Sequence, residues 1–284
     1  MTTPRRLHDF LSAGAPVVAL QLTRVRGSSP RGEGTEMFVS ADALHGTIGG
    51  GQLEHRAIAA ARELLAAGDT TVTLDLPLGP EIGQCCGGRV EVTLTLLAAA
   101  GRQAALDRAN AEQRLLPHVY ILGAGHVGRA LADQFQHMPV QTIVIDPRAD
   151  ELAQVRADVD CRLSVLPEHD IHTAPPGSAF IVLTHDHGLD FLLTSAALGR
   201  GDAAYVGMIG SATKRASFLS WGKQNCDGTL PIAQLNCPIG AGGSRDKRPA
   251  VIAALVVAEV ITALTSEPAA TAPLGATEPS LAAQ

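Results

Sequence analysis

Strand-like and helix-like segments alternate through the second half of the chain, and this alternation restricts the fold more than any other feature. The strand-like segments, which are short and rich in apolar residues, are 118–123, 140–146, 161–166, 179–185 and 203–210. Helical segments separate most of them, and a final helix is expected over 248–264. Because parallel strands need crossover connections, which are usually helices, this pattern predicts βαβ units around a parallel sheet.

A glycine loop joins the first of these strands to the helix that follows it. Gly123, Gly125 and Gly128 have the spacing G-x-G-x-x-G, and Asp146 stands at the end of the next strand. Gly123 permits a tight turn, Gly125 lets the backbone approach an anion, and Gly128 lets helix and strand pack closely. The helix N-terminus offers N–H groups to a phosphate, and Asp146 offers a carboxylate to ribose hydroxyls. We predict a Rossmann-like sheet and leave open whether it binds a nucleotide.

The first half of the chain predicts a domain of a different kind. Its strand-like segments are 16–25, 36–40, 70–76 and 89–97. Apolar residues at helical spacing predict helices over 4–13 and 52–68, and Gly68 is a typical helix stop. Strands and helices are mixed here without strict alternation, so we predict a mixed α/β domain.

The fold class is therefore α/β with two domains. We place the N-terminal mixed α/β domain at 1–100, a polar and partly helical linker at 101–117 and the Rossmann-like domain at 118–265. The tail 266–284 is rich in Pro, Ala, Ser and Thr, and we expect it to be disordered.

The composition excludes several classes of function. Aromatic residues make up only 3% of the 284 residues, which disfavours base stacking on single-stranded nucleic acid. The net charge is −6 and no basic cluster stands out, so neither DNA nor a membrane surface is an expected partner. The chain has no signal-peptide pattern and no run of 18 apolar residues. Five cysteines, an odd number, fit reduced thiols, so we expect a cytoplasmic protein.

Two further loops follow strands of the second half, at the strand ends where open α/β sheets bind ligands. One loop carries His185 and His187. The other carries Ser211 at a helix start, with Lys214 and Arg215 in the first turn of that helix. Cations at a helix N-terminus oppose its dipole, so we expect an anion between them. The two histidines do not complete a metal site by themselves, and hydrogen bonding within the loop is the alternative.

A glycine triplet, Gly49-Gly50-Gly51, stands directly before the first-half helix. Successive exposed N–H groups in such a loop form an anion-binding nest against a helix N-terminus. Glu54, in the first turn, stabilises the helix and is placed to orient a ligand. We favour the nest over a flexible connection.

Two adjacent cysteines, Cys85 and Cys86, lie in a glycine-rich turn that leads into the strand at 89–97. Adjacent residues of an extended chain point to opposite sides, so only one of the two faces a given pocket. Arg89 would favour the thiolate, which is the form that attacks or binds soft metals. From the spacing alone, a packing role at the strand entrance is an equal alternative.

Taken in chain order, these motifs resemble the XdhC/CoxI family. The matching segments are GSSPRG, GTIGGGQLE, GQCCGGRVEV, GAGHVGRALA, VIDPR, THDHGLDF, YVGMIGSATKR and CPIG. Within that family, the double cysteine is most similar to that of xanthine dehydrogenase accessory proteins. After CPIG the family usually continues close to LDIGAKTPAEIA, whereas this chain has AGGSRDKRPAVIA, so segment 241–248 departs from the pattern.

The resemblance implies a role in maturation rather than a turnover reaction. Such proteins bind the molybdenum cofactor in its molybdopterin form and hold it while a cysteine desulfurase supplies the terminal sulfido ligand of molybdenum. They then pass it to apo xanthine dehydrogenase. Expected partners are therefore xanthine dehydrogenase, a cysteine desulfurase and molybdenum-cofactor biosynthesis proteins, and we expect a homodimer.

The resemblance also names candidate site residues. Cys85 and Cys86 match the cysteine motif linked to cofactor binding, with Cys86 as the expected metal ligand. The full set of candidate cofactor-binding residues is Cys85, Cys86, Gly49, Gly50, Gly51, Gly123, Gly125, Gly128, Asp146, His185, Lys214 and Arg215.

Three other functions stay open. The glycine loop and Asp146 favour an NAD(P)-dependent oxidoreductase, although no separate substrate domain follows and no acid–base group beyond His185 and His187 is evident. A pure interaction module would not need open glycine loops. A redox sensor would use Cys85 and Cys86 as a strained vicinal disulfide that is readily reduced.

Overall fold

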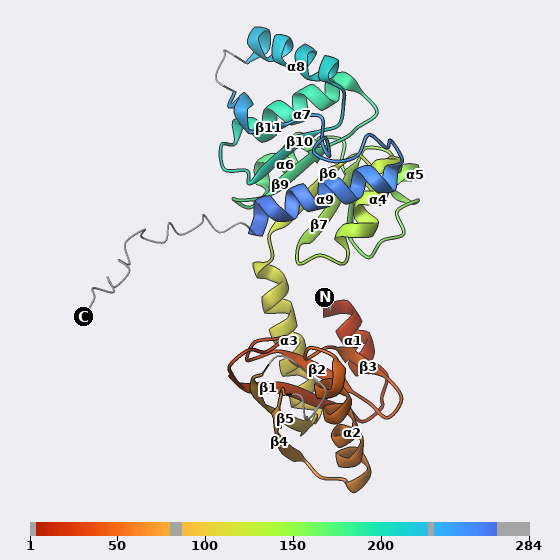
Figure 1. Cartoon of the computed structure of the whole chain (residues 1–284). Coiled ribbons are helices and arrows are strands. Elements are labelled where there is room, and N and C mark those ends of the chain that lie inside the picture. Colours follow the sequence, from red (N-terminus) through yellow and green to blue (C-terminus); the bar gives the residue numbers. More distant parts are fainter. Residues whose placement is uncertain (1–3, 80–86, 227–229, 266–284) are drawn as a thin grey trace, which may run out of the picture. The chain divides into compact units, whose positions relative to one another are not determined.

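The chain forms two units in the computed structural model, Met1–Leu115 and Leu116–Gln284 (Figure 1). The structure describes residues 4–79, 87–226 and 230–265. It confirms the predicted α/β class with one antiparallel and one parallel sheet. The expected disordered tail, 266–284, lies outside the described residues.

The first unit is built on a five-stranded antiparallel sheet in the order β3-β2-β1-β5-β4. The strands are β1 Val18–Arg26, β2 Glu36–Val39, β3 Leu44–Gly46, β4 Thr71–Pro77 and β5 Arg89–Leu96. Successive side chains of a strand point to opposite faces. Val18, Leu20 and Leu22 of β1 enter one hydrophobic core, while Ala19 enters another, so both faces of this sheet are covered.

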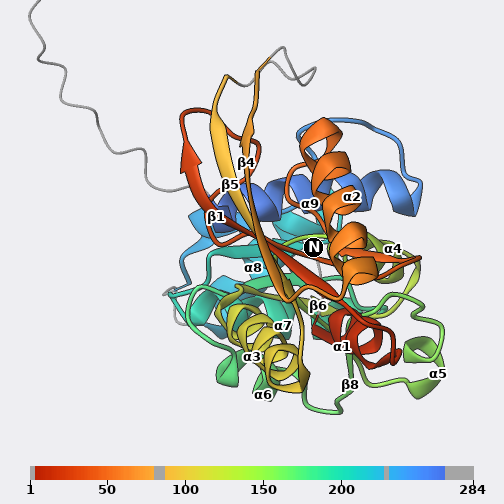
Figure 2. The same ribbon diagram turned by 90° about the horizontal axis from the view of Figure 1, so that it is seen from below.

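Three helices cover the two faces of the first sheet: α1 Pro4–Ser12, α2 Gly51–Ala67 and α3 Ala99–Leu115. Helix α2 packs its Leu53, Ala57 and Leu64 against one face. Helices α1 and α3 cover the other face (Figure 2). Helix α2 ends at Gly68, whose φ of 75° is left-handed and whose N–H donates to the Leu64 carbonyl at 3.1 Å, as the sequence predicts.

Helix α3 occupies most of the segment that was expected to be a partly helical linker, 101–117, and it packs on the first unit. Arg102 donates to the carbonyl oxygens of Leu11 and Ala15, and Ala105 is buried. These contacts fasten a largely polar helix to the first unit. Only one of its residues is fully buried, so the sequence shows no apolar stripe from which packing would be predicted.

The second unit contains a six-stranded parallel sheet in the order β11-β10-β9-β6-β7-β8. The strands are β6 His118–Leu122, β7 Gln141–Asp146, β8 Asp160–Leu163, β9 Ala179–Val182, β10 Tyr205–Met208 and β11 Leu235–Asn236. Counted from β6, this is the order 3-2-1-4-5-6 of dinucleotide-binding folds, in which ligands bind at the carboxyl ends of the strands. The prediction of a Rossmann-like sheet is confirmed.

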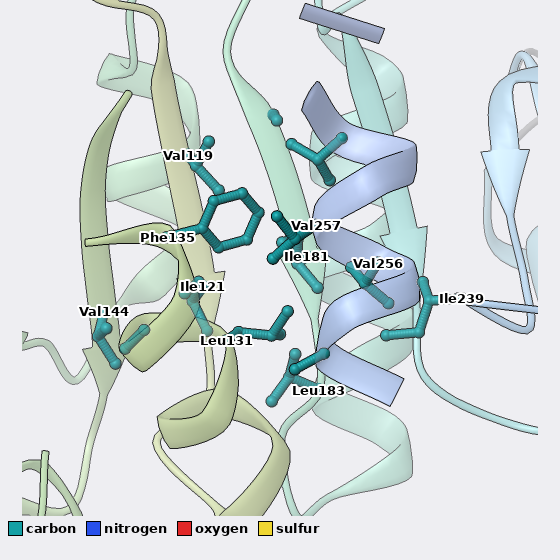
Figure 3. Packing of buried hydrophobic residues seen from close by; sticks show 14 of the residues in the cluster. Val119, Ile121, Leu131, Phe135, Val144, Ile181, Leu183, Ile239, Val256 and Val257 are labelled. Carbon is teal, nitrogen blue, oxygen red and sulfur yellow. The ribbon is translucent and has the colours of Figure 1, made fainter. Parts of the chain in front are cut away.

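Helices cover both faces of the parallel sheet. They are α4 His126–Phe135, α5 Ala149–Leu152, α6 Pro167–Thr173, α7 His187–Gly199, α8 Ala212–Asn225 and α9 Pro249–Thr265, with a 3-10 turn at Ile232–Gln234. Helices α4 and α9 share one core, in which Phe135 and Val257 pack against Val119 and Ile181 of the sheet (Figure 3). Helices α7 and α8 belong to the core on the opposite face. Within the described part of the chain, no helix is long and apolar enough to cross a membrane.

Candidate functional site

The glycine loop of the second unit has the geometry that its sequence predicts. Gly123 has a left-handed φ of 129°, and a Cβ there would lie 2.4 Å from the Leu183 carbonyl oxygen. A Cβ at Gly128 would lie 2.0 Å from the carbonyl oxygen of Gly123, whereas a Cβ at Gly125 would meet nothing within 4 Å. No side chain caps the N-terminus of α4 at Gly125. The loop therefore leaves an open approach to the first turn of α4, as an anion site requires.

Asp146 is fully engaged within the protein. Its Oδ2 accepts hydrogen bonds from the Ala124 N–H at 2.8 Å and from Arg148 Nη2 at 2.9 Å. Its Oδ1 accepts from the backbone N–H and from Nε of Arg148, both at 2.9 Å. The residue is only 1% exposed, and four donors use the four lone-pair directions of a carboxylate. Asp146 thus holds the glycine loop in place, and ribose hydroxyls would have to displace Arg148 to reach it.

We expect the stability of the second unit to fall in acid because of Asp146. Burial alone would raise the pKa of this carboxyl, but hydrogen bonds from Arg148 and Ala124 outweigh burial and hold the pKa below its usual value. The stabilisation is therefore present above the unfolded-state pKa and is lost as the pH falls through the folded-state pKa. Urea unfolding followed by Trp221, the single tryptophan, should show Asp146→Asn less stable than wild type at neutral pH. The difference should vanish in acid, and a difference that stays constant with pH would contradict the assignment.

The histidine loop after β9 forms a helix cap. Asp186 Oδ1 accepts hydrogen bonds from the N–H groups of Gly188 at 2.6 Å and Leu189 at 3.0 Å, which caps the N-terminus of α7. Its neighbours His185 and His187 are exposed. No group of three or more His, Cys, Asp or Glu side chains suited to a metal occurs among the described residues. The hydrogen bonds within this loop are made by Asp186 and Thr184 rather than by the two histidines.

The anion beside Lys214 is a carboxylate of the protein itself. Lys214 Nζ forms an ion pair with Asp190 Oδ2, and both side chains are buried. Asp190 Oδ1 also accepts from the N–H and the hydroxyl of Thr184, at 2.8 and 2.7 Å. Ser211 caps α8 as predicted, because its Oγ accepts from the Lys214 N–H at 3.2 Å. Arg215 has no ion-pair partner in the described part of the chain, and the ion pair of this loop is made by Lys214 alone.

Cys237 is a neighbour of this ion pair that the sequence analysis did not identify. It follows the edge strand β11, and its thiol is half-buried. Burial raises the pKa of the Cys237 thiol, while the positive charges of Lys214 and Arg215 act in the opposite direction. The two-residue strand before it carries no alternation pattern, so only the CPIG motif marked this position in the sequence.

The glycine triplet of the first unit is closed by Glu54. One oxygen of this carboxylate, Oε2, accepts from the Thr47 hydroxyl at 2.6 Å and from the N–H groups of Ile48 and Gly50 at 3.2 and 3.1 Å. Thr47 Oγ1 in turn accepts from the Gly49 N–H at 3.1 Å. The loop does gather N–H groups around an anion, as a nest would, but here that anion is Glu54. The role predicted for Glu54, orienting a ligand, thus becomes holding the loop itself.

Three sequence motifs of the first unit meet at one place. A Cβ at Gly49 would lie 2.5 Å from Pro30 Cγ, and a Cβ at Gly88 would lie 2.1 Å from the Ser28 carbonyl oxygen. The loop 27–31, the glycine triplet and the segment directly after the two cysteines therefore pack together. Only glycine permits the approach at Gly88, since the atom it faces belongs to the backbone.

Cys85 and Cys86 lie outside the described residues, so their predicted roles are not tested by the geometry. The strands on either side of them are described: the Leu78 N–H donates to the Gly88 carbonyl at 2.7 Å, and the Gly87 N–H donates to the Leu78 carbonyl at 2.9 Å. Arg89 donates to both oxygens of Asp75, at 2.6 and 2.9 Å. A carboxylate thus already balances the charge that was expected to favour a thiolate.

A pocket of about 800 Å³ adjoins the same loops on the α1 and α3 side of the first sheet. Its charged lining comes from α1, α3, β2 and the loop 31–36 and comprises Arg6, Arg31, Glu33, Glu36, Arg108 and Glu112. Arg108 pairs with Glu36 at 2.8 Å, whereas Arg31 has no ion-pair partner among the described residues. His45 also lines the pocket. Its Nε2 is buried and has no hydrogen-bond partner in the described part of the chain. Burial, and to a lesser extent the charge of Arg6, lowers the pKa of the His45 imidazole. The sequence held no sign of this pocket, because its lining comes from distant segments.

These features define a two-domain α/β protein with a Rossmann domain in its second half. A model of the XdhC and CoxI family matches residues 10–76, and a model of the XdhC Rossmann domain matches residues 119–260. The chain therefore belongs to the XdhC and CoxI family, as the motifs predict.

Two relatives place the chain among known proteins. It is 24% identical over 267 residues to the uncharacterized protein YqeB of Escherichia coli strain K12. That match covers 89% of this chain but only 44% of the relative, so the chain spans less than half the length of YqeB. It also superimposes on a crystal structure described as a xanthine dehydrogenase from Bacillus halodurans, with a TM-score of 0.72 and 19% identity. The superposition covers 96% of this chain and 98% of the other and supports the fold of both units.

Proposed function

We propose that the chain takes part in the maturation of a xanthine dehydrogenase as a carrier of the molybdenum cofactor, without a turnover reaction of its own. In this role it binds the molybdopterin form, holds it while a cysteine desulfurase supplies the sulfido ligand, and delivers it to the apo enzyme. Membership of the XdhC and CoxI family supports the proposal. So does the description of the Bacillus halodurans protein, which names a xanthine dehydrogenase.

The observation that carries the proposal is the meeting of three motifs in the first unit. The loop with Ser28 and Pro30, the triplet at Gly49 and the strand entrance at Gly88 are far apart in sequence but pack in direct contact. Gly87 and Gly88 follow Cys85 and Cys86 directly, so the proposed thiol ligands are tethered to this cluster of loops. A thiolate at Cys86 is a suitable soft ligand for the cargo metal.

The neighbouring pocket is suited to the organic part of the cargo. Its volume of about 800 Å³ is in the range of small-molecule sites. Arg31, which has no ion-pair partner among the described residues, offers a guanidinium to the terminal phosphate. Neutral His45, with its buried and unpartnered Nε2, offers a hydrogen-bonding group to a polar ring edge.

An NAD(P)-dependent oxidoreductase is the second candidate, favoured by the strand order of the second sheet and by the open approach at Gly125. The hydrogen bonds of Asp146 oppose it, since the carboxylate that would hold ribose hydroxyls already accepts four donors. A nucleotide at the N-terminus of α4 is compatible with the carrier role, because the two proposed sites belong to different units.

Cofactor retention tests the proposal. The chain is produced anaerobically in a host that makes molybdopterin, and bound pterin is measured by fluorescence after oxidation. We expect a stoichiometric amount of pterin in wild type and a loss in Cys86→Ala, because the thiolate is a direct ligand. The same assay on Cys85→Ala shows whether the adjacent thiol is also a ligand.

Cys161→Ala is the matched control, since this exposed thiol belongs to the second unit and is not part of the cysteine motif. It should retain the full amount of pterin. Wild-type protein that carries NAD(H) and no pterin would contradict the carrier role and favour the oxidoreductase. Pterin that is retained in full after both Cys85→Ala and Cys86→Ala would remove the thiols from the site.

A further inference from the structure

Strand β8 forms an open edge of the second sheet. It pairs on one side with β7, in the register Cys161 with Val144 and Leu163 with Asp146. Among the described residues no strand pairs with its other side, and all four residues of β8 are exposed. An exposed edge offers unpaired N–H and C=O groups to another strand, and proteins usually shorten, charge or cover such edges.

Large apolar side chains gather where this edge strand ends. Leu163, Val165 and Leu166 are 61%, 88% and 60% exposed. They are three of the six large hydrophobic side chains that are exposed in the described part of the chain, and all three lie within four consecutive residues. A local concentration of this kind marks an interaction surface better than single exposed apolar residues do.

The backbone of β8 directs specific groups outward. The Ser164 N–H donates to the Asp146 carbonyl of β7 at 3.4 Å. In a parallel ladder every second residue bonds to the same neighbour, so Arg162 and Ser164 direct their backbone groups to β7. Cys161 and Leu163 therefore direct their N–H and C=O groups to the open side.

The charged residues on either side of Cys161 would match those of a second copy of β8 that runs in the opposite direction. Asp160 precedes Cys161 and Arg162 follows it, and the two charged side chains share one face, 2.8 Å apart. If two β8 strands run antiparallel about a twofold axis at Cys161, each Asp160 stands opposite the partner's Arg162. Opposite charges directly across an antiparallel pair stabilise it, and the symmetry makes the contact twice. A strand of another protein would have to bring its own matching charges.

We propose that β8 pairs antiparallel with β8 of a second copy of this chain, around a twofold axis at Cys161. The two six-stranded sheets then continue into one another. The outward N–H and C=O groups of Cys161 bond to those of the partner's Cys161, and Leu163, Val165 and Leu166 lie beside the new contact. This dimer is independent of the cofactor that the chain carries.

Cys161 tests the position of the twofold axis. Residues of a hydrogen-bonded antiparallel pair have Cα atoms about 5.5 Å apart, within the range that a disulfide spans. Burial and the charge of Asp160 raise the pKa of the Cys161 thiol, so the full chain is oxidised with copper–phenanthroline in mildly alkaline buffer. We expect a covalent dimer on non-reducing gels, with the Cys161 peptide linked to itself in the mass spectrum. Cys161→Ser should abolish the linkage, and absence of the self-linked peptide in wild type would overturn this register.

Charge exchange tests the pairing itself, by sedimentation velocity on the full chain. In a dimer of Arg162→Asp, two acidic residues face each other at both symmetry-related places, and in a dimer of Asp160→Arg, two basic residues do. Each single variant should therefore raise the dimer dissociation constant roughly tenfold or more. An equimolar mixture of the two variants should form a heterodimer of about wild-type affinity. Both variants lack the Asp160–Arg162 pair within one chain, so recovery on mixing cannot come from that pair. A monomeric wild type, unchanged affinity in the single variants, or no recovery on mixing would each overturn the proposal.

Discussion

Asp190→Ala should lower the unfolding free energy of the second unit by about 3–5 kcal/mol, because it leaves a buried ammonium group without its counter-charge. Asp190 is completely buried, and its partner Lys214 is 9% exposed in its side chain. The change also removes the acceptor of two hydrogen bonds from Thr184. A loss of this size is a large part of the 5–15 kcal/mol that typically stabilises a domain.

The measurement is urea unfolding followed by Trp221. The single tryptophan lies in α8, the helix that carries Lys214, and packs on Phe218 with ring centroids 6.1 Å apart, so its fluorescence reports on this unit. Asp246→Ala is the matched control. Asp246 pairs with Arg248, whose side chain is 79% exposed, and surface pairs contribute about 1 kcal/mol or less.

A double variant separates the buried charge from general disruption. Asp190→Asn combined with Lys214→Met removes both charges and keeps an oxygen acceptor for Thr184. Replacing a buried ion pair as a whole is often close to neutral, so the double variant should be more stable than Asp190→Ala. If Asp190→Ala were no worse than Asp246→Ala, or if the double variant were the least stable of the three, the ion pair would not have the proposed role.

Most of the long elements could be predicted from the sequence because their patterns are physical consequences of burial. Helix α3 is the exception, since only its Ala105 is buried. Alternation along β5 places Val90, Val92 and Leu94 in the core under α2, while the residues between them stay outside that core. The short apolar segments that became β6 and β9 are covered by helices on both faces. Strands β3 and β11 have only three and two residues and are too short to show a period. They exist because a longer neighbour offers an unpaired edge, which is a tertiary effect.

The sequence predicted the hydrogen-bond donors and the cation of the candidate site, but it did not predict which anions they contact. Glycine loops and a cation near a helix start indicate where N–H groups and positive charge gather, and in the structure carboxylates contact several of these groups. The anions that occupy them are Glu54, Asp146 and Asp190, which belong to the chain itself. A sequence motif shows that a loop can hold an anion, but only the fold shows whether a carboxylate of the chain already lies there.

Gly88→Ala should disrupt the loop cluster of the first unit and abolish pterin binding. The added Cβ would lie 2.1 Å from the Ser28 carbonyl oxygen and 2.8 Å from that of Arg26, and backbone atoms cannot rotate away as a side chain does. The ends of β1 and β5 must therefore separate, at an expected loss of about 3 kcal/mol. The pairing of Arg26 with Arg89 at the ends of these strands would be the first to weaken.

Hydrogen exchange resolved by peptide is the appropriate measurement, because Trp221, Tyr120 and Tyr205 all lie in the second unit. Protection should fall at 24–28 and 88–92 while the second unit stays protected, and pterin retention should fall with it. Gly32→Ala is the control, since its Cβ would meet no atom within 4 Å. Full protection with lost pterin would place Gly88 in direct contact with the cargo, whereas lost protection with full pterin would show that the cofactor binds elsewhere.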